Sequence, residues 1–281
     1  MLRHVTRRHA AILALTFILL PLLWGTGFNR NGAMFGSISD MLGFALSDFL
    51  LRGALVAVEI AALAMAGGIV LGLLLALMRL SRLAPVQSCA WGYIWFVRGT
   101  PVILQLVFLY DALPPLGIRL DSFTTAVLGF ALNEAAFSAE IIRGGIIAVN
   151  RNQSIAAASF GMGHFLTLRR IILPQSMRAI LPGMANQVIS MIKGTSIASV
   201  IFVNELTFRA QQVVGQNFRF FTVFAAAGLI YLAMTSAVAG VQAWLERHFD
   251  PERPHDEARA SGVGVPMPLR RHAGPGVHRR G

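Results

Sequence analysis

Polar and charged side chains interrupt a long apolar stretch of this sequence at 123–148. Asn133, Glu134, Glu140 and Arg143 all fall within it. A charged group at the centre of a bilayer costs about 2.5–3.5 kcal/mol on insertion scales, so such groups usually face a polar cavity or pair with one another. Glu140 and Arg143 have the i, i+3 spacing of a helical ion pair, and Glu140 belongs either to that pair or to a polar pathway. Asn133 and Glu134 lie deeper and are candidates for contacting a polar solute.

A second set of polar residues follows one face of a later apolar stretch. The set comprises Asn186, Ser190 and Lys193 at i, i+4 and i+7, followed by Thr195 and Ser196. A polar stripe on an apolar helix should line the bundle interior or a subunit interface. Gly194 can loosen the helix and free backbone carbonyls for a polar solute. Lys193 either contacts such a solute or is accommodated by snorkelling or by pairing with Glu134 or Glu140.

A third candidate is the run Arg98-Gly99-Thr100-Pro101, which interrupts the apolar stretch at 89–112. Pro101 removes a helix hydrogen bond and Gly99 weakens the turn, which favours a break or kink near a solute's route. The same residues are equally compatible with a plain helix start that leaves Arg98 at the membrane interface. Gln105, one turn later, is placed to reach a polar ligand.

These side chains must be positioned by helices that cross a membrane. Of the 281 residues, 55% are hydrophobic and 13% are charged, against about 25% charged in soluble domains. Apolar runs of about 20 residues between short polar loops are typical of membrane spans. The six runs lie near 9–25, 50–78, 89–112, 123–148, 176–203 and 220–245. We therefore predict an all-α membrane protein with six transmembrane helices, the first retained because no clear signal-peptidase site follows it.

Several chemistries are excluded by residue type alone. Lys193 is the only lysine and follows Ile192, so the chain has no phosphate-binding P-loop, and any ATP must be bound by another subunit. Cys89 is the only cysteine, which rules out an internal disulfide or a paired-cysteine metal or redox site. No serine, histidine and acid set has workable spacing within the spans. We expect no catalytic residue, metal or cofactor, and no nucleic-acid partner, because the net charge of +11 comes from arginines in loops and in the tail.

The arginines also orient the chain. With both termini in the cytoplasm, six spans place 17 arginines on the cytoplasmic side and 5 on the other, as the positive-inside rule requires. The expected organisation has three parts: 1–47 with the first span and an outer loop, 48–247 as the main membrane domain, and 248–281 as a basic, disordered cytoplasmic tail.

The longest cytoplasmic connection, 149–175, has the pattern of a docking surface. A short helix is expected at 153–160, with Gly161 ending it, and a second amphipathic stretch runs to Pro174, whose ring should stop the helix. Ala156 and Ala157 permit close helix approach. Arg169 and Arg170 can meet acidic groups or lipid phosphates. The alternative is an ordinary amphipathic surface loop.

This connection resembles the EAA loop of the permease subunits of ABC-type importers. Ala156-Ala157, Gly161, Ile171 and Leu173-Pro174 match the family's spacing. Four flanking motifs narrow the resemblance to the polar amino acid branch, which includes histidine, arginine and glutamine permeases. They are Arg98-Gly-Thr-Pro101, Asn133-Glu-Ala-Ala136, Ala139-Glu-Ile-Ile-Arg-Gly-Gly145 and Lys193-Gly-Thr-Ser196. The sequence departs from the family where its glutamate is replaced by Ile155 and its aspartate by Gly194.

The resemblance implies a type I importer bundle in a bacterial inner membrane. It implies two ATPase subunits that bind ATP, a second permease subunit that is identical or a sister chain, and an extracytoplasmic solute-binding protein. The permease would translocate a polar amino acid or similar small zwitterion by alternating access, with the loop coupling it to the ATPase. Two alternatives are a permease for an opine or another small zwitterion and, in a different class, an ion- or proton-conducting subunit that uses Glu134, Glu140 and Lys193 as relay groups.

Overall fold

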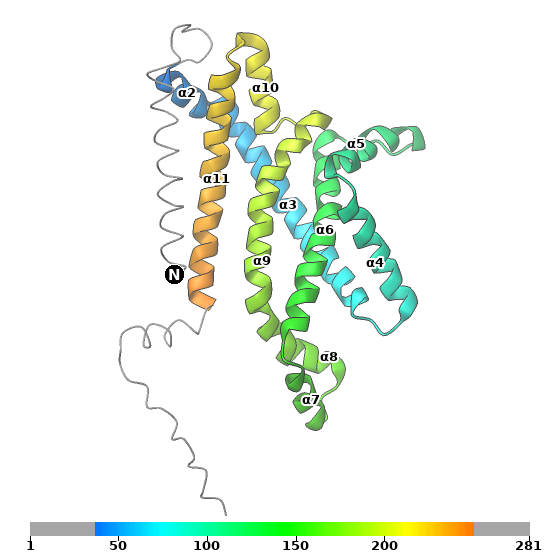
Figure 1. The fold of residues 1–281 in the computed structure, drawn as a ribbon. Coiled ribbons are helices and arrows are strands. Elements are labelled where there is room, and N and C mark those ends of the chain that lie inside the picture. Colours follow the sequence, from blue (N-terminus) through cyan, green and yellow to red (C-terminus); the bar gives the residue numbers. More distant parts are fainter. Residues whose placement is uncertain (1–36, 250–281) are drawn as a thin grey trace, which may run out of the picture.

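The computed structural model describes residues 37–249, which form helices and no strands (Figure 1). The expected first span at 9–25 and the tail from 250 onward lie outside the described residues.

Three straight helices are long and apolar enough to cross a membrane: α3 (Asp48–Arg79), α6 (Ser122–Ala148) and α11 (Phe220–Phe249, apolar over Phe220–Trp244). They confirm the spans expected at 50–78, 123–148 and 220–245. Two bent pairs raise the number of candidate spans in the described part to as many as five. Six spans in the whole chain thus remain a prediction.

The first bent pair is α4 (Ala84–Gly99) and α5 (Val102–Ala112), which meet at 100°. Thr100 and Pro101 between them are extended, with ψ of 143° and 133°. Pro101 forms the N-cap of α5, where its missing N–H removes no helix bond. Of the two sequence interpretations, a break inside the apolar stretch is confirmed.

The second bent pair joins the continuous helical segment His164–Ile201 to α10 (Leu206–Asn217), with a bend of 51°. The first segment comprises α8 (His164–Thr167), the π-helix η2 (Leu168–Ile172), α9 (Leu173–Gly194) and the 3-10 helix η3 (Thr195–Ile201). The expectation that Pro174 stops the helix is wrong, because the helix continues through it. The wider turn of η2 directly precedes Pro174, and the Leu173 N–H bonds to the carbonyl of Leu168, five residues back. This π turn accommodates a proline that an uninterrupted α-helix would not.

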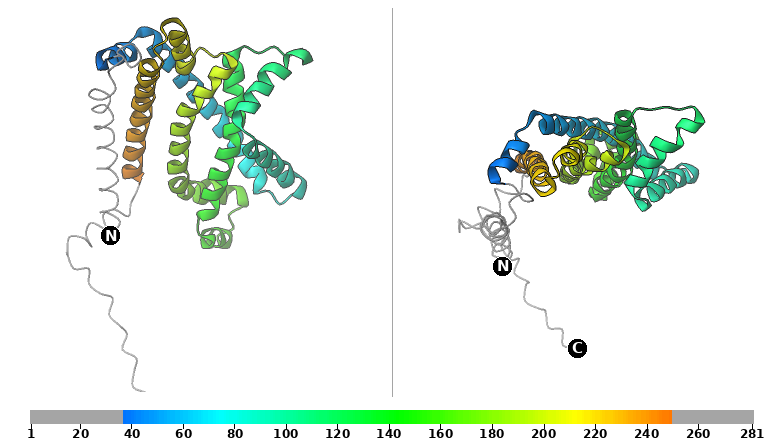
Figure 2. Two further views of the ribbon diagram at one scale, coloured as in Figure 1. Left: turned by 45° about the horizontal axis from the view of Figure 1, so that its top comes forward. Right: turned by 90° about the horizontal axis from the view of Figure 1, so that it is seen from above.

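Two short helices and a second hydrophobic cluster, at one end of the bundle, complete the fold. α2 (Ile38–Ala45) and α10 (Leu206–Asn217) lie at the end of the bundle opposite α7 (Arg151–Ser159) and α8 (Figures 1 and 2). Leu50, Leu206 and Val223 are fully buried there, where α2, α3, α10 and α11 meet. The sequence interpretation missed α10, whose mixed polar composition hides it among loops.

The central core forms where α3 packs along α6. Added Cβ atoms at Gly68 and Gly72 would lie only 2.6 Å from side-chain atoms of Glu134 and Ser138. The two backbones therefore approach closely, as glycines at a helix–helix contact allow.

Candidate functional site

Glu134 lies at this closest approach of α3 and α6, and only 2% of it is exposed. Its Oε1 accepts a hydrogen bond of 2.6 Å from Ser138, and its Oε2 accepts one of 3.0 Å from Gln187 on α9. A buried carboxylate is retained when donors satisfy it. Glu134 therefore connects three helices and does not line an open surface of the single chain.

Gln105 fastens the bend between α4 and α5. Its Nε2 donates to the carbonyl oxygens of Val97 at 2.9 Å and Thr100 at 3.3 Å, and to the Thr100 hydroxyl at 2.8 Å. Its Oε1 accepts a 3.1 Å bond from the Asn133 side chain on α6. Gln105 and Asn133 were both expected to contact the solute. The structure brings them together, and their side-chain amides hydrogen-bond to each other.

The polar stripe on α9 is exposed in the single chain. Asn186, Ser190 and Lys193 all face outward, as their spacing predicts. Gln242 of α11 donates a long, 3.4 Å bond to Asn186. Among the side chains of residues 37–244, Lys193 makes no ion pair, so the pairing expected with Glu134 or Glu140 is not present there.

The three residues after Lys193 differ in exposure and in their hydrogen bonds. The regular α-helix ends at Gly194, as expected, and η3 follows. Thr195 is fully buried and donates to the carbonyl of Ile192 at 2.8 Å, so it is not part of the exposed stripe. Ser196 is partly exposed and donates to the carbonyl of Lys193 at 2.7 Å.

Glu140 lies among arginines near the α7 end of α6. Arg143 bonds it through two nitrogens, the shortest contact being 2.7 Å, which confirms the expected i, i+3 pair. Arg79 at the end of α3 lies 3.8 Å away. Arg98 packs its guanidinium over the Phe137 ring at 5.2 Å. The Glu140 carboxylate is therefore paired with arginine side chains of α6 and α3.

The connection between α6 and α9 contains the short helix expected near 153–160, here α7 at Arg151–Ser159. Gly161 has φ of +72°, and the N–H groups of Gly161 and Met162 bond to the carbonyls of Ala158 and Ala157 at 2.9 and 3.1 Å. This is the Schellman motif, which glycine adopts without strain. Gly161 therefore ends α7 as predicted.

The surface of this connection is largely exposed. Ala157 is buried, whereas Ala156, Arg169, Arg170 and Pro174 are exposed. Two aromatic rings project from it, with Phe160 87% exposed and Phe165 75% exposed. Phenylalanines this exposed mark an interaction surface more often than a solvated loop.

Several residues of these networks were not anticipated from sequence. Gln187, Ser138 and Arg79 are the partners of the predicted glutamates. Glu205 is fully buried at the start of α10, where it accepts bonds from two backbone N–H groups and from Tyr231. Among these contacts, only the Glu134–Ser138 hydrogen bond could have been predicted from local sequence, because the two residues have i, i+4 spacing on one helix.

Known proteins resemble this chain over most of its length. The permease YckA of Bacillus subtilis, named a probable amino-acid ABC transporter permease, is 39% identical over 72% of this chain and 89% of its own. OccM of Rhizobium radiobacter, an octopine transport system permease, is 40% identical over 73% and 87%. GlnP of Escherichia coli, a glutamine transport system permease, is 36% identical over 70% and 91%.

Solved structures agree with these relatives. An amino acid ABC transporter crystallised with histidines has a TM-score of 0.72 and 34% identity, covering 77% of this chain and 100% of that one. The MetNI methionine transporter has the same fold, with a TM-score of 0.63 at 14% identity over 72% of this chain and 99% of that one. Residues 68–251 match the family of binding-protein-dependent transport system inner membrane components. The chain therefore belongs to this family of ABC transporter permeases and has the type I importer fold.

Proposed function

We propose that this permease imports a polar amino acid across a bacterial inner membrane, driven by ATP hydrolysis in a separate subunit. The observation that carries the proposal is α7, a capped helix that projects from one end of the bundle beside the exposed rings of Phe160 and Phe165. A rigid, exposed helix with an apolar rim suits the groove of a partner protein. The names of YckA and GlnP support an amino acid as the solute.

The proposed coupling surface includes α7 and the following turn. Ala156 and Ala157 allow a partner to approach, Gly161 sets the angle at which the chain leaves α7, and Arg169 and Arg170 offer charges to acidic groups. The helix continues from α8 through Pro174 into α9. Movement of α7 by an ATPase would therefore be passed directly to the membrane part.

The proposed solute pathway follows the exposed stripe of Asn186, Ser190 and Lys193, continued by Ser196. Lys193 has no ion-pair partner within the described residues, and a cation in that state suits the carboxylate of an amino acid. Glu134, Gln105 and Asn133 are assigned to positioning the helices, because each forms side-chain hydrogen bonds that join one helix to another. Thr195 is assigned to packing, and Arg98 and Glu140 to the charged end of the bundle.

The proposed assembly contains two ATPase subunits, a second permease subunit and an extracytoplasmic solute-binding protein. The chain itself would catalyse no covalent reaction and hold no cofactor. The arginine distribution favours placing α7 and both termini in the cytoplasm. The end with α2, α10 and the α5–α6 connection then faces the binding protein.

An ion relay through Glu134, Glu140 and Lys193 is disfavoured. Glu134 is bonded to Ser138 and Gln187, Glu140 is paired with arginines, and Lys193 contacts neither. A relay also leaves α7 unexplained. An opine remains the second candidate solute, on the strength of the similarity to OccM.

The test compares Gly161→Val with Gly163→Val in the full-length protein. Neither glycine has an atom within 4 Å of an added Cβ, but Gly161 has φ of +72° and Gly163 has φ of −66°. A side chain in the left-handed region costs about 1–2 kcal/mol, so only Gly161→Val should distort the exit from α7. Each variant is purified from native membranes in mild detergent and assayed for a co-purifying ATPase and for uptake of labelled glutamine, arginine and octopine.

We expect parent and Gly163→Val to retain the ATPase and uptake, and Gly161→Val to lose both while still inserting into the membrane. Uptake of octopine alone would reassign the solute and leave the import mechanism standing. An intact parent that neither retains an ATPase nor imports any of these solutes would refute the proposal.

A further inference from the structure

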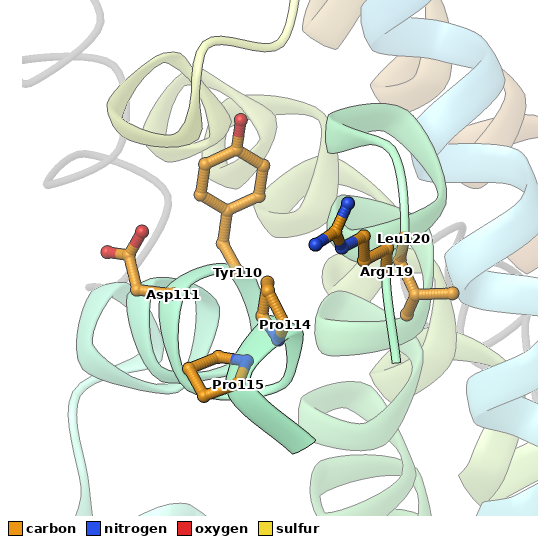
Figure 3. Close-up of a pocket in the computed structure, with 6 residues that line it drawn as sticks. All are labelled: Tyr110, Asp111, Pro114, Pro115, Arg119 and Leu120. Carbon is orange, nitrogen blue, oxygen red and sulfur yellow. The ribbon is translucent and has the colours of Figure 1, made fainter. Parts of the chain in front are cut away.

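A pocket of about 600 Å³ opens at the end of the bundle opposite α7. Its volume is in the range of small-molecule sites, about 300–1,000 Å³. The walls come from the end of α5, the 3-10 turn η1 (Pro114–Leu116) and the segment that leads into α6. The lining residues are Tyr110, Asp111, Pro114, Pro115, Arg119 and Leu120 (Figure 3).

The two charged groups of this pocket have opposite signs and are not paired. Figure 3 shows Asp111 and Arg119 on either side of Tyr110. Neither forms an ion pair with any side chain between residues 37 and 244, the range over which side chains are described. The nearby carboxylate of Asp121 is occupied as the N-cap of α6, because it accepts bonds of 3.0 and 2.6 Å from the Thr124 N–H and hydroxyl. Those bonds hold the pKa of Asp121 below its usual value.

The loop that presents these charges is ordered by its own backbone. The N–H groups of Leu116 and Ile118 both bond to the carbonyl of Leu113, at 3.0 and 3.2 Å. Gly117 turns the chain with φ of +87°, a conformation that favours glycine. Two consecutive prolines stiffen the wall further. Arg119 therefore projects from a fixed turn, which lowers the entropy lost when it binds a ligand.

The pocket also lies beside the C-terminal end of η3. The Tyr110 ring packs against Phe202 with centroids 6.4 Å apart, and its hydroxyl lies 3.4 Å from the Ser122 hydroxyl. Phe202 is the C-cap of η3, the helix that continues from Lys193 and Gly194. A solute that leaves the pocket past Tyr110 would thus reach η3, the helix that leads back to Ser196 and Lys193.

We propose that this pocket is a weak receiving site for the zwitterionic end of an α-amino acid. The Asp111 carboxylate accepts hydrogen bonds from the α-ammonium group, and the Arg119 guanidinium donates to the α-carboxylate. The remaining volume takes the solute's side chain without selecting it. This proposal rests on amino acid import as the function and adds a binding site ahead of the membrane pathway.

The test locates ligand binding with single cysteines in the assembled, full-length permease in membrane vesicles. Cys89 is replaced by serine, and Pro115→Cys is compared with Leu116→Cys. Pro115 lines the pocket, whereas its neighbour Leu116 does not and is 74% exposed. The rate of modification by N-ethylmaleimide is measured with and without L-glutamine. At an L-glutamine concentration of twice its Kd, binding should slow modification of Pro115→Cys about threefold, following 1 + [L]/Kd. The modification rate of Leu116→Cys should stay unchanged.

Two charge variants and two half-ligands then identify the contacts. Asp111→Asn and Arg119→Gln should each weaken protection by L-glutamine about two- to fivefold, the range expected for exposed ion pairs. 4-Aminobutanamide carries only the ammonium group, and its protection should depend on Asp111 alone. Glutaramic acid carries only the carboxylate and should depend on Arg119 alone. An unchanged rate at Leu116→Cys in each charge variant shows that the reagent still reaches this loop equally, and an unchanged melting temperature shows that the variants are folded.

Three results would overturn the site: no protection by L-glutamine, protection that neither charge variant weakens, or protection by the solute-binding protein without amino acid. The last would make the pocket a protein-docking surface. Uptake by the parent is measured on the same vesicles, so failure of this site with normal amino acid uptake leaves the proposed function intact.

Discussion

Gly68 on α3 lies directly against Glu134 on α6, and an added Cβ at residue 68 would stand 2.6 Å from both the Cβ and Cγ atoms of the glutamate. No real Cβ contact is that short, so the glycine is the condition for burying this carboxylate between the helices. The packing and the polar network at Glu134 depend on the same residue.

Gly68→Ala should therefore destabilise the permease by about 1–3 kcal/mol through overpacking. Gly228→Ala on α11 is the matched control, because nothing lies within 4 Å of its added Cβ. That control should be neutral or slightly stabilising, since alanine is the better helix former. Thermal unfolding in detergent measures both, and equal midpoints would contradict the packing.

Gln105 and Asn133 should be energetically coupled across the bend of α4 and α5. Replacing each by leucine, singly and together, should give a coupling energy of about 0.5–1.5 kcal/mol in a double-mutant cycle of thermal stability. Gln211 is exposed on α10, so Gln211→Leu is the control and should be additive with Asn133→Leu. Additivity of the Gln105 pair would show that the bond between the two amides has no energetic role.

Tyr231→Phe should cost about 0.5–1.5 kcal/mol of stability, because its hydroxyl donates to Glu205 at 2.8 Å and contacts the Thr207 hydroxyl at 3.1 Å. Glu205→Ala should cost about 1–3 kcal/mol, since it leaves buried donors without a partner. Tyr110→Phe loses only a 3.4 Å contact and is the control. The melting temperatures should fall in the order Tyr110→Phe, Tyr231→Phe, Glu205→Ala.

Lys193→Met should lower the rate of uptake by at least about tenfold, which corresponds to a loss of 1.4 kcal/mol of interaction with the solute. The melting temperature should not change, because no described ion pair is lost. Arg52→Met removes an exposed cation that pairs only with Asp48 in the described region and should transport normally. Normal uptake by Lys193→Met would remove this residue from the pathway, and a parallel fall in melting temperature would assign it a structural role.

Local patterns in the sequence were sufficient for several elements. The three straight spans follow from the length and the predominantly apolar composition of their segments, and the end of α7 follows from Gly161. The Glu140–Arg143 pair follows from i, i+3 spacing. In each case neighbouring residues on one helix determine the result.

Other features depend on tertiary contacts that spacing does not reveal. Gln187 reaches Glu134 from 53 positions along the chain, and Arg79 approaches Glu140 only because α3 and α6 pack side by side. The helix passes Pro174 because a π turn precedes it, and single-residue propensity does not predict that turn. The pocket at Asp111 and Arg119 exists only when η1 folds its loop.

The close contact of α3 and α6 also limits how the permease can move. At Gly68 and Gly72 the α3 backbone lies directly against the side chains of Glu134 and Ser138, with no room for a further side chain. In such close packing, sliding one helix past the other would force atoms to overlap. The two helices should consequently travel as one rigid body during a transport cycle. Displacements would then be concentrated at the two sharp bends of the described residues, between α4 and α5 and between η3 and α10.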